Sequence, residues 1–293
     1  MKRKMFSALT AAALAASMLL TGCSSSMQVA KVASRFRETL KAQPVTGATA
    51  EITADVTLGE ESQEGRLRMV VHGQSDWEAL RLYSQTDSTL TLPDREIHRS
   101  FQSYHSGEKS QYLRYIHIDQ SDLWIRAEGK NSIFNLDSAA LLKLLDSASD
   151  TATAELQENT AGGAASYLLK LVLEGSSLEN FLVSSGMRLP QWMVGMSLKD
   201  VKIPVEVEIE DKTYLPLQVR MEIQGIDSLL AQALAEDLML DAEIRELGLD
   251  LGIENISVLI SNFSYEPAEV PLLPMGAAEK ALDLNKLREL QNA

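Results

Sequence analysis

Cysteine is almost absent from this sequence: Cys23 is the single one among 293 residues. No disulfide can therefore form within one chain, and stability has to come from a packed apolar core. After a short N-terminal leader about 270 residues remain, enough for one large domain or two small ones. Histidine is also scarce. The four histidines lack the close pairing and the cysteine support of a zinc site, so we expect no metal and no cofactor: His72, His98, His105 and His117.

Basic side chains are outnumbered, with 27 Lys and Arg residues against 41 Asp and Glu residues and a formal net charge of −14. A negatively charged protein repels the phosphate backbone of nucleic acids, so we expect no nucleic-acid partner. Anionic lipid headgroups are repelled for the same reason. Attachment to a membrane would therefore need an anchor other than the overall charge.

The sequence also lacks the usual catalytic motifs. Ser106 and Lys109 have the short serine–lysine spacing of penicillin-interactive enzymes, but the Ser-Asp-Asn and Lys-Thr-Gly elements are missing. There is no Gly-x-Ser-x-Gly elbow and no phosphate-binding glycine loop. We therefore expect no enzyme. A hydrolase with an unrecognised site stays open as an alternative, and it would need a pocket with a desolvated carboxylate or histidine.

Three basic residues at positions 2–4 precede an apolar run over 6–20, which is too short for an ordinary transmembrane helix. The run ends in Leu20-Thr21-Gly22-Cys23, and this segment resembles a bacterial lipoprotein signal peptide with its lipobox. The resemblance implies cleavage before Cys23, diacylglyceryl modification of its thiol and an extracytoplasmic protein anchored to the bacterial cell membrane. Two acyl chains give durable attachment. An unmodified thiol after a plain secretory signal is the alternative.

The chain divides into a signal peptide (1–22), a lipidated N-terminus and tether (23–28) and one domain (29–293). Apolar residues at helical spacing predict an amphipathic helix over 27–42: Val29, Ala33, Phe36 and Leu40. Its other face is mostly basic: Lys31, Arg35, Arg37 and Lys41. This face either rests on anionic headgroups near the anchor or is solvated above a sheet.

Period-two alternation predicts a long strand over 48–58, a meander with short strands at 67–71, 80–82, 113–115 and 123–127, and a strand over 167–173. The clearest unit is a hairpin with strands over 201–209 and 215–223, whose first strand has Glu206, Glu208 and Glu210 on its outward face. A last strand pair is expected over 247–253 and 256–260. Helices are expected over 138–145, 226–240 and 277–290. The fold class is therefore α+β, with an antiparallel sheet and inserted helices.

This layout resembles the LppX/LprG-type lipoproteins and the LolA/LolB lipoprotein carriers over roughly residues 27–275. The fragments that carry the likeness are Tyr112 and Tyr115 before Asp122-Leu123-Trp124-Ile125-Arg126, Tyr167-Leu168-Leu169 before Gly175, Thr213-Tyr214-Leu215-Pro216, and Phe263-Ser264-Tyr265 before Val270-Pro271. The resemblance implies a strongly curved antiparallel sheet, a half-barrel, backed by helices around a hydrophobic-ligand site. It supplies no catalytic residue. The soluble carrier has no anchor, so the anchor in this chain favours a membrane-attached binder.

Candidate ligand contacts gather around Pro190, where methionine side chains are flexible and polarizable and suit variable alkyl chains such as palmitate. The candidates are Phe181, Leu182, Met187, Trp192, Met193 and Met196, together with Trp124 and Tyr112. These side chains could instead fill the sheet and leave no cavity. We expect a non-catalytic lipoprotein that binds a lipid or lipoprotein acyl chain. The alternative is an envelope adaptor with a filled core and an unknown protein partner. Charge reversal at Glu206, Glu208 and Glu210 would then disturb binding of that partner.

Overall fold

The computed structural model describes residues 28–58, 63–76, 81–108, 111–119, 121–128, 138–147, 153–157, 165–174, 202–224, 251–267 and 269–283. The strands are β1 (Gly47–Leu58), β2 (Gln63–Asp76), β3 (Arg81–Thr91), β4 (Glu96–Glu108), β5 (Gln111–Ile118), β6 (Trp124–Glu128), β7 (Thr153–Gln157), β8 (Ser166–Glu174), β9 (Lys202–Glu210), β10 (Pro216–Gln224), β11 (Leu251–Ser264) and β12 (Leu282–Asp283).

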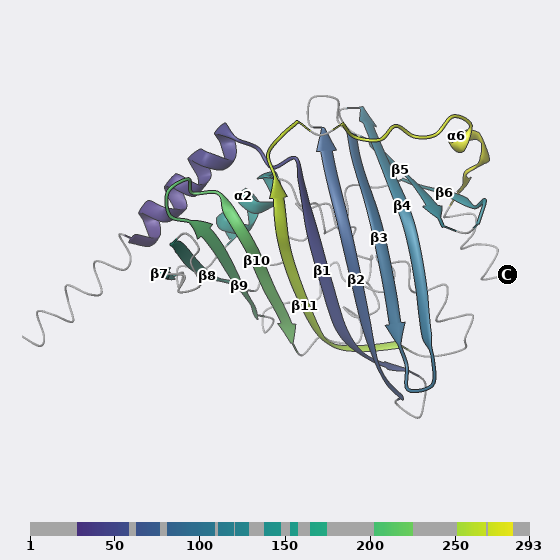
Figure 1. Cartoon of the computed structure of the whole chain (residues 1–293), viewed down its shortest axis with the longest axis horizontal. Coiled ribbons are helices and arrows are strands. Elements are labelled where there is room, and N and C mark those ends of the chain that lie inside the picture. Colours follow the sequence, from purple (N-terminus) through teal and green to yellow (C-terminus); the bar gives the residue numbers. More distant parts are fainter. Residues whose placement is uncertain are drawn as a thin grey trace, which may run out of the picture.

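All twelve strands of the described segments belong to one sheet, in the order β12-β6-β5-β4-β3-β2-β1-β11-β10-β9-β8-β7 (Figure 1). Neighbours pair antiparallel, except for β12, which pairs parallel to β6. Because β12 and β7 stand at opposite ends of this order, the described sheet is open and does not close into a barrel. The expected antiparallel sheet is confirmed at this level, and the described segments contain few helices.

The amphipathic helix near the N-terminus spans 28–42 in the described residues. Its buried stripe consists of Val32, Phe36 and Leu40, spaced by four residues, so that one face of the helix enters the core. Figure 1 shows this helix beside β8, β9 and β10. The Thr39 hydroxyl donates a hydrogen bond to the carbonyl of Thr213, in the turn between β9 and β10, at 3.2 Å. The predicted helix is confirmed, and Val32, which the predicted apolar stripe did not include, joins Phe36 and Leu40 on its buried face.

A second helix, α2 (Ser138–Ser147), buries Leu141, Leu144 and Leu145 in the same core. Its Asp146 forms an ion pair with Arg37 of helix 28–42 at 2.6 Å, so the two helices meet. The third described helix, α6 (Ala277–Lys280), is only four residues long. No helix among the described segments has the length and apolar character needed to cross a membrane.

Strand β1 defines two faces of the sheet. Its inner face carries Ala50, Ile52 and Ala54, all buried, and its outer face carries the alternate residues, such as Glu51. Register extends the inner face across β2, β11, β10, β9 and β8, six adjacent strands with β1. Its buried apolar residues beyond β1 are Leu67, Met69, Val71, Ile256, Val258, Ile260, Val219, Ile203, Val205, Val207, Ile209, Leu169, Leu171 and Leu173.

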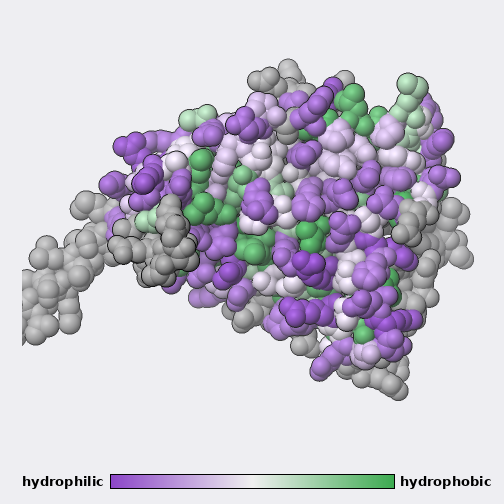
Figure 2. Space-filling model, viewed as in Figure 1, coloured by the Kyte–Doolittle hydropathy of each residue, from purple (hydrophilic) through white to green (hydrophobic). Residues whose placement is uncertain are grey.

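The outer face is polar. Arg68 on β2 donates from its Nε to Glu51 on β1 at 2.7 Å, and Thr49 bonds to His72 at 3.1 Å. Figure 2 shows hydrophilic side chains over most of the sheet surface turned to the viewer, with single apolar residues between them. Apolar residues scattered in this way are normal on a protein surface. The outward placement predicted for Glu206, Glu208 and Glu210 agrees with their half-buried positions opposite the buried valines and isoleucines of β9.

The inner face becomes polar on β3 and β4, where hydroxyl side chains replace aliphatic ones. Register places Ser88 opposite Met69 and Thr86 opposite Val71, and both are buried, as is Ser103 on β4. A strand with polar residues on both faces shows no alternation of apolar and polar residues. This explains why the sequence pattern predicts no strand over 96–108, where β4 lies.

Three expected elements differ in the structure. The strand pair expected over 247–253 and 256–260 is, from Leu251 on, one strand, β11, with a bulge where Asp55 pairs with Asn255 and Val56 with Ile253. The helix expected over 277–290 ends at Lys280, because the chain becomes extended and continues into β12. In the hairpin, Leu217 does not share the apolar face. A register shift at the start of β10 leaves it 42% exposed.

Candidate functional site

Most of the predicted ligand contacts fall outside the described residues. This holds for Phe181, Leu182, Met187, Trp192, Met193 and Met196, and for the side chain of Tyr112. The predicted lipidation site, Cys23, and the helix expected over 226–240 also lie outside them. Their roles stay predictions.

Trp124, the remaining predicted contact, lies on the outer face at the start of β6. Its ring stacks on His117 of β5 with centroids 4.6 Å apart and an angle of 29° between the planes. Tyr104 of β4 lies 5.8 Å from Trp124, and Tyr83 of β3 lies 5.1 Å from Tyr104. The next residue, Ile125, is buried on the opposite face. Trp124 therefore packs in an aromatic cluster that faces away from the apolar inner face, and a ligand contact of this residue stays a prediction.

The inner face of the sheet is the candidate site for an apolar ligand. At the centre of β1, Ile52 lies between Met69 of β2 and Val258 of β11, and small alanines flank it at positions 50 and 54. The buried side chains of this region are aliphatic or methionine. Such a surface can hold an alkyl chain only by burial, at about 0.8 kcal/mol for each methylene removed from water.

A polar cluster lies at the β4–β5 end of the inner face. The hydroxyl of Ser103 accepts hydrogen bonds from Nε and Nη2 of Arg114, at 3.3 and 3.2 Å. Burial and, to a lesser extent, the positive charge of Arg114 together lower the pKa of the neighbouring His105 to about 3. The imidazole is therefore neutral near pH 7. A base with so low a pKa accepts protons poorly, so this histidine is a weak candidate for general-base catalysis.

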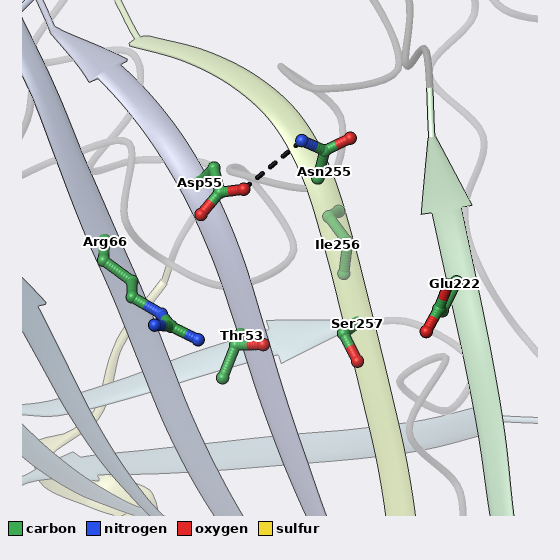
Figure 3. A pocket seen from close by; sticks show the side chains of 7 residues that line it. All are labelled: Thr53, Asp55, Arg66, Glu222, Asn255, Ile256 and Ser257. Atoms are coloured by element: carbon green, nitrogen blue, oxygen red, sulfur yellow. Dashed lines mark hydrogen bonds between the residues drawn. The ribbon is translucent and has the colours of Figure 1, made fainter.

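The pocket drawn in Figure 3 lies on the outer face and is of a different kind. It has a volume of about 190 Å³ and is lined by Thr53, Asp55, Arg66, Glu222, Asn255, Ile256 and Ser257. The side-chain amide of Asn255 donates to a carboxylate oxygen of Asp55 at 3.3 Å. Its polar lining does not suit an acyl chain. Within the described part of the chain no three His, Cys, Asp or Glu residues come together as a metal site would require.

Comparison with known proteins finds little that is similar. No protein-family model matches the chain, and no curated protein matches it. A crystal structure of a DUF1329 family protein from Desulfovibrio piger, at 1.75 Å resolution, is weakly similar. The similarity covers 86% of this chain and 96% of that one, with 11% sequence identity and a TM-score of 0.28.

No sequence signal pointed to the outer pocket. Its residues come from four strands, and Asp55 and Asn255 are 200 positions apart. Each is an ordinary polar residue on the outward side of a strand, and no spacing along the chain relates them. The predicted break between the strands over 247–253 and 256–260 is the nearest signal, because the bulge of β11 lies beside it.

Proposed function

We propose that this protein is an extracytoplasmic bacterial lipoprotein, anchored through acyl chains on Cys23, that binds a lipid acyl chain or another apolar ligand without catalysis. The ligand would lie against the inner face of the sheet, in the manner of the LolA/LprG-type half-barrels. The lipobox supports the anchor. The open sheet with one apolar face and one polar face supports the binding site.

One observation carries the proposal: six adjacent strands present aliphatic side chains on one face, and every described strand belongs to that one sheet. An apolar sheet face has to be covered, and the described cover consists of helix 28–42 and α2. Long strands such as β2 and β11, with 14 residues each, extend the face well beyond one helix. An acyl chain with a dozen buried methylenes would gain on the order of 10 kcal/mol before the cost of ordering it.

The direct test uses a secreted form with Cys23→Ser, so that the acyl chains of the anchor cannot be mistaken for a ligand. The protein is purified without detergent, and bound molecules are extracted and identified by mass spectrometry. We expect lipid at close to one molecule per chain and uptake of a fluorescent fatty acid by the stripped protein. An empty protein that takes up no fatty acid contradicts the proposal.

A pair of variants separates a ligand site from a filled core. Ala54→Leu enlarges a buried side chain on the inner face, and Thr53→Leu makes a similar change on the outer face of the same strand. If ligand lies against β1, Ala54→Leu lowers bound lipid several-fold with little loss of stability. In a filled core the extra volume costs about 1–3 kcal/mol in the free energy of unfolding. Thr53→Leu leaves the lipid content unchanged.

The envelope adaptor is the second candidate, and close packing in the described core favours it. Phe36, Leu40 and Ile52 are each no more than 1% exposed. An adaptor would present the acidic outer face of β9 to its partner. Capture from membranes that is lost on charge reversal of Glu206, Glu208 and Glu210, by a protein without bound lipid, would support the adaptor over the lipid binder.

A further inference from the structure

The pocket in Figure 3 spans four neighbouring strands on the outer face of the sheet. Arg66 comes from β2, Thr53 from β1, Ser257 from β11 and Glu222 from β10. Register places Ser257 between Thr53 and Glu222, and it pairs Arg66 with Asp55. Three strand spacings of about 4.8 Å therefore separate the backbones that carry the arginine and the glutamate. The bulge of β11 opposite Asp55 interrupts the ladder at the pocket.

The two charged side chains at the ends of the pocket form no hydrogen bond or ion pair with the described residues. Figure 3 shows the guanidinium of Arg66 extended toward Thr53 and the carboxylate of Glu222 directed toward Ser257. Arg68 differs from Arg66 in this respect. It lies two residues further along β2 on the same face, and it forms an ion pair with Glu51 at 2.7 Å. One cation and one carboxylate thus face each other across a space with hydroxyl groups between them.

The carboxylate of Asp55 forms one side of the pocket. Asp55 accepts a hydrogen bond from the amide of Asn255 at 3.3 Å, which occupies one of its oxygens and orients the group. The hydroxyls of Thr53 and Ser257 can each donate and accept. The lining therefore offers a bidentate cationic group at one end, carboxylates at the other end and along one side, and adaptable hydroxyls in the middle.

We propose that this pocket binds a small zwitterion of the α-amino acid class, with the ligand carboxylate on Arg66 and the ligand ammonium on Glu222. A free anion fits less well, because Asp55 and Glu222 together outweigh one guanidinium. A sugar lacks an aromatic ring to stack on, since no aromatic residue lines the pocket. The volume of about 190 Å³ is enough for several water molecules and for a ligand as small as a simple amino acid.

This site is independent of the proposed acyl site, because the two lie on opposite faces of the sheet. Binding at the outer pocket requires both charges of the ligand, because each charge contacts a different end of the pocket. Each exposed ion pair alone is weak, and only a ligand that engages both ends in one geometry combines the two.

The test uses the full chain and three probes: L-alanine, acetate and methylammonium. Acetate and methylammonium each carry one of the two charges of alanine. Binding is measured at low ionic strength by calorimetric titration and by saturation-transfer NMR. We expect alanine to bind at least tenfold more tightly than either half. Arg66→Gln and Glu222→Gln should each weaken alanine binding at least tenfold.

Two matched controls remove the same charges from the same face without touching the pocket. Arg68→Gln lies on β2 beside Arg66, and Glu206→Gln lies on β9 beside β10. Each should change alanine binding less than twofold. The proposal is overturned if alanine binds no more tightly than acetate or methylammonium. It is equally overturned if the controls weaken binding as much as the pocket variants, or if inorganic phosphate binds more tightly than alanine.

Discussion

The hydroxyl of Ser138, the first residue of α2, accepts a hydrogen bond from the backbone N–H of Val45 at 2.7 Å, across 93 positions of the chain. Both residues are buried. Val45 lies between helix 28–42 and β1, so the bond ties the entry into the sheet to the second helix. The hydroxyl of the first residue of this helix is thus engaged with a distant segment of the chain.

Replacing this acceptor should destabilise the protein. Ser138→Ala removes the partner of a buried N–H, which costs about 1–3 kcal/mol in the free energy of unfolding. Urea denaturation followed by circular dichroism measures the change. Ser34→Ala is the control, because Ser34 is exposed on helix 28–42 and its bond to Glu38 is long at 3.4 Å. Its effect should stay within about 0.5 kcal/mol. Equal effects of the two substitutions would contradict this role of Ser138.

Gly65 of β2 lies so close to the neighbouring strands that any side chain at this position should destabilise the protein. A Cβ at this position of β2 would lie 2.9 Å from Cδ2 of Leu92 and 3.0 Å from the carbonyl oxygen of Thr91. The backbone atom cannot move away without disturbing β3, so Gly65→Ala should cost about 1–3 kcal/mol. Thermal unfolding measures it. Leu92→Ala removes the side-chain contact but also costs core packing, so the double variant Gly65→Ala, Leu92→Ala is compared with Leu92→Ala alone. Equal stability of these two variants would show that the carbonyl contact is unimportant.

His105 should make stability depend on pH. Its folded pKa of about 3 is below the ordinary value of 6.5, so the unfolded chain binds more protons between these two values. Stability that is present above pH 6.5 is therefore lost as the pH falls, by up to about 1.4 kcal/mol for each pH unit. The free energy of unfolding, measured from pH 7.5 to 5, should fall less steeply in His105→Gln.

Phe101→Leu provides the control for this slope. Phe101 lies on the same face of β4 and carries no ionisable group, so its substitution should shift stability by the same amount at every pH. Parallel curves for the wild type and His105→Gln would show that His105 is protonated equally in the folded and unfolded states.

The lipid anchor predicted at Cys23 gives a localisation test. Cys23→Ser removes the thiol that would carry the diacylglyceryl group, so the protein should move from the membrane fraction to the aqueous phase on detergent partitioning. Labelling with radioactive palmitate should disappear in parallel. Ser24→Ala, at the next position, should leave both results unchanged. Persistent membrane association of the unlabelled variant would indicate another mode of attachment, such as the basic face of helix 28–42.

Local patterns account for the elements that were predicted correctly. β1, β8 and the β9–β10 hairpin alternate apolar and polar residues because one face of each is buried, and such periodicity can be read from a single segment. Strand β4 has buried Ser103 on its inner face, so no comparable contrast exists along its length. The two residues of β12 are extended because β6 lies beside them, although their own segment favours a helix.

Hydrophobic periodicity, net charge and the lipobox are properties of neighbouring residues, so they can be inferred from the chain alone. The outer pocket cannot, since it exists because β2, β1, β11 and β10 lie next to each other in one register. That order depends on how the inner faces of distant strands pack together, and a shift by one residue would turn Arg66 and Glu222 to the opposite face. The local alternation of apolar and polar residues therefore determines that Arg66 and Glu222 lie on strands. The pairing of distant strands determines that their side chains lie at one pocket.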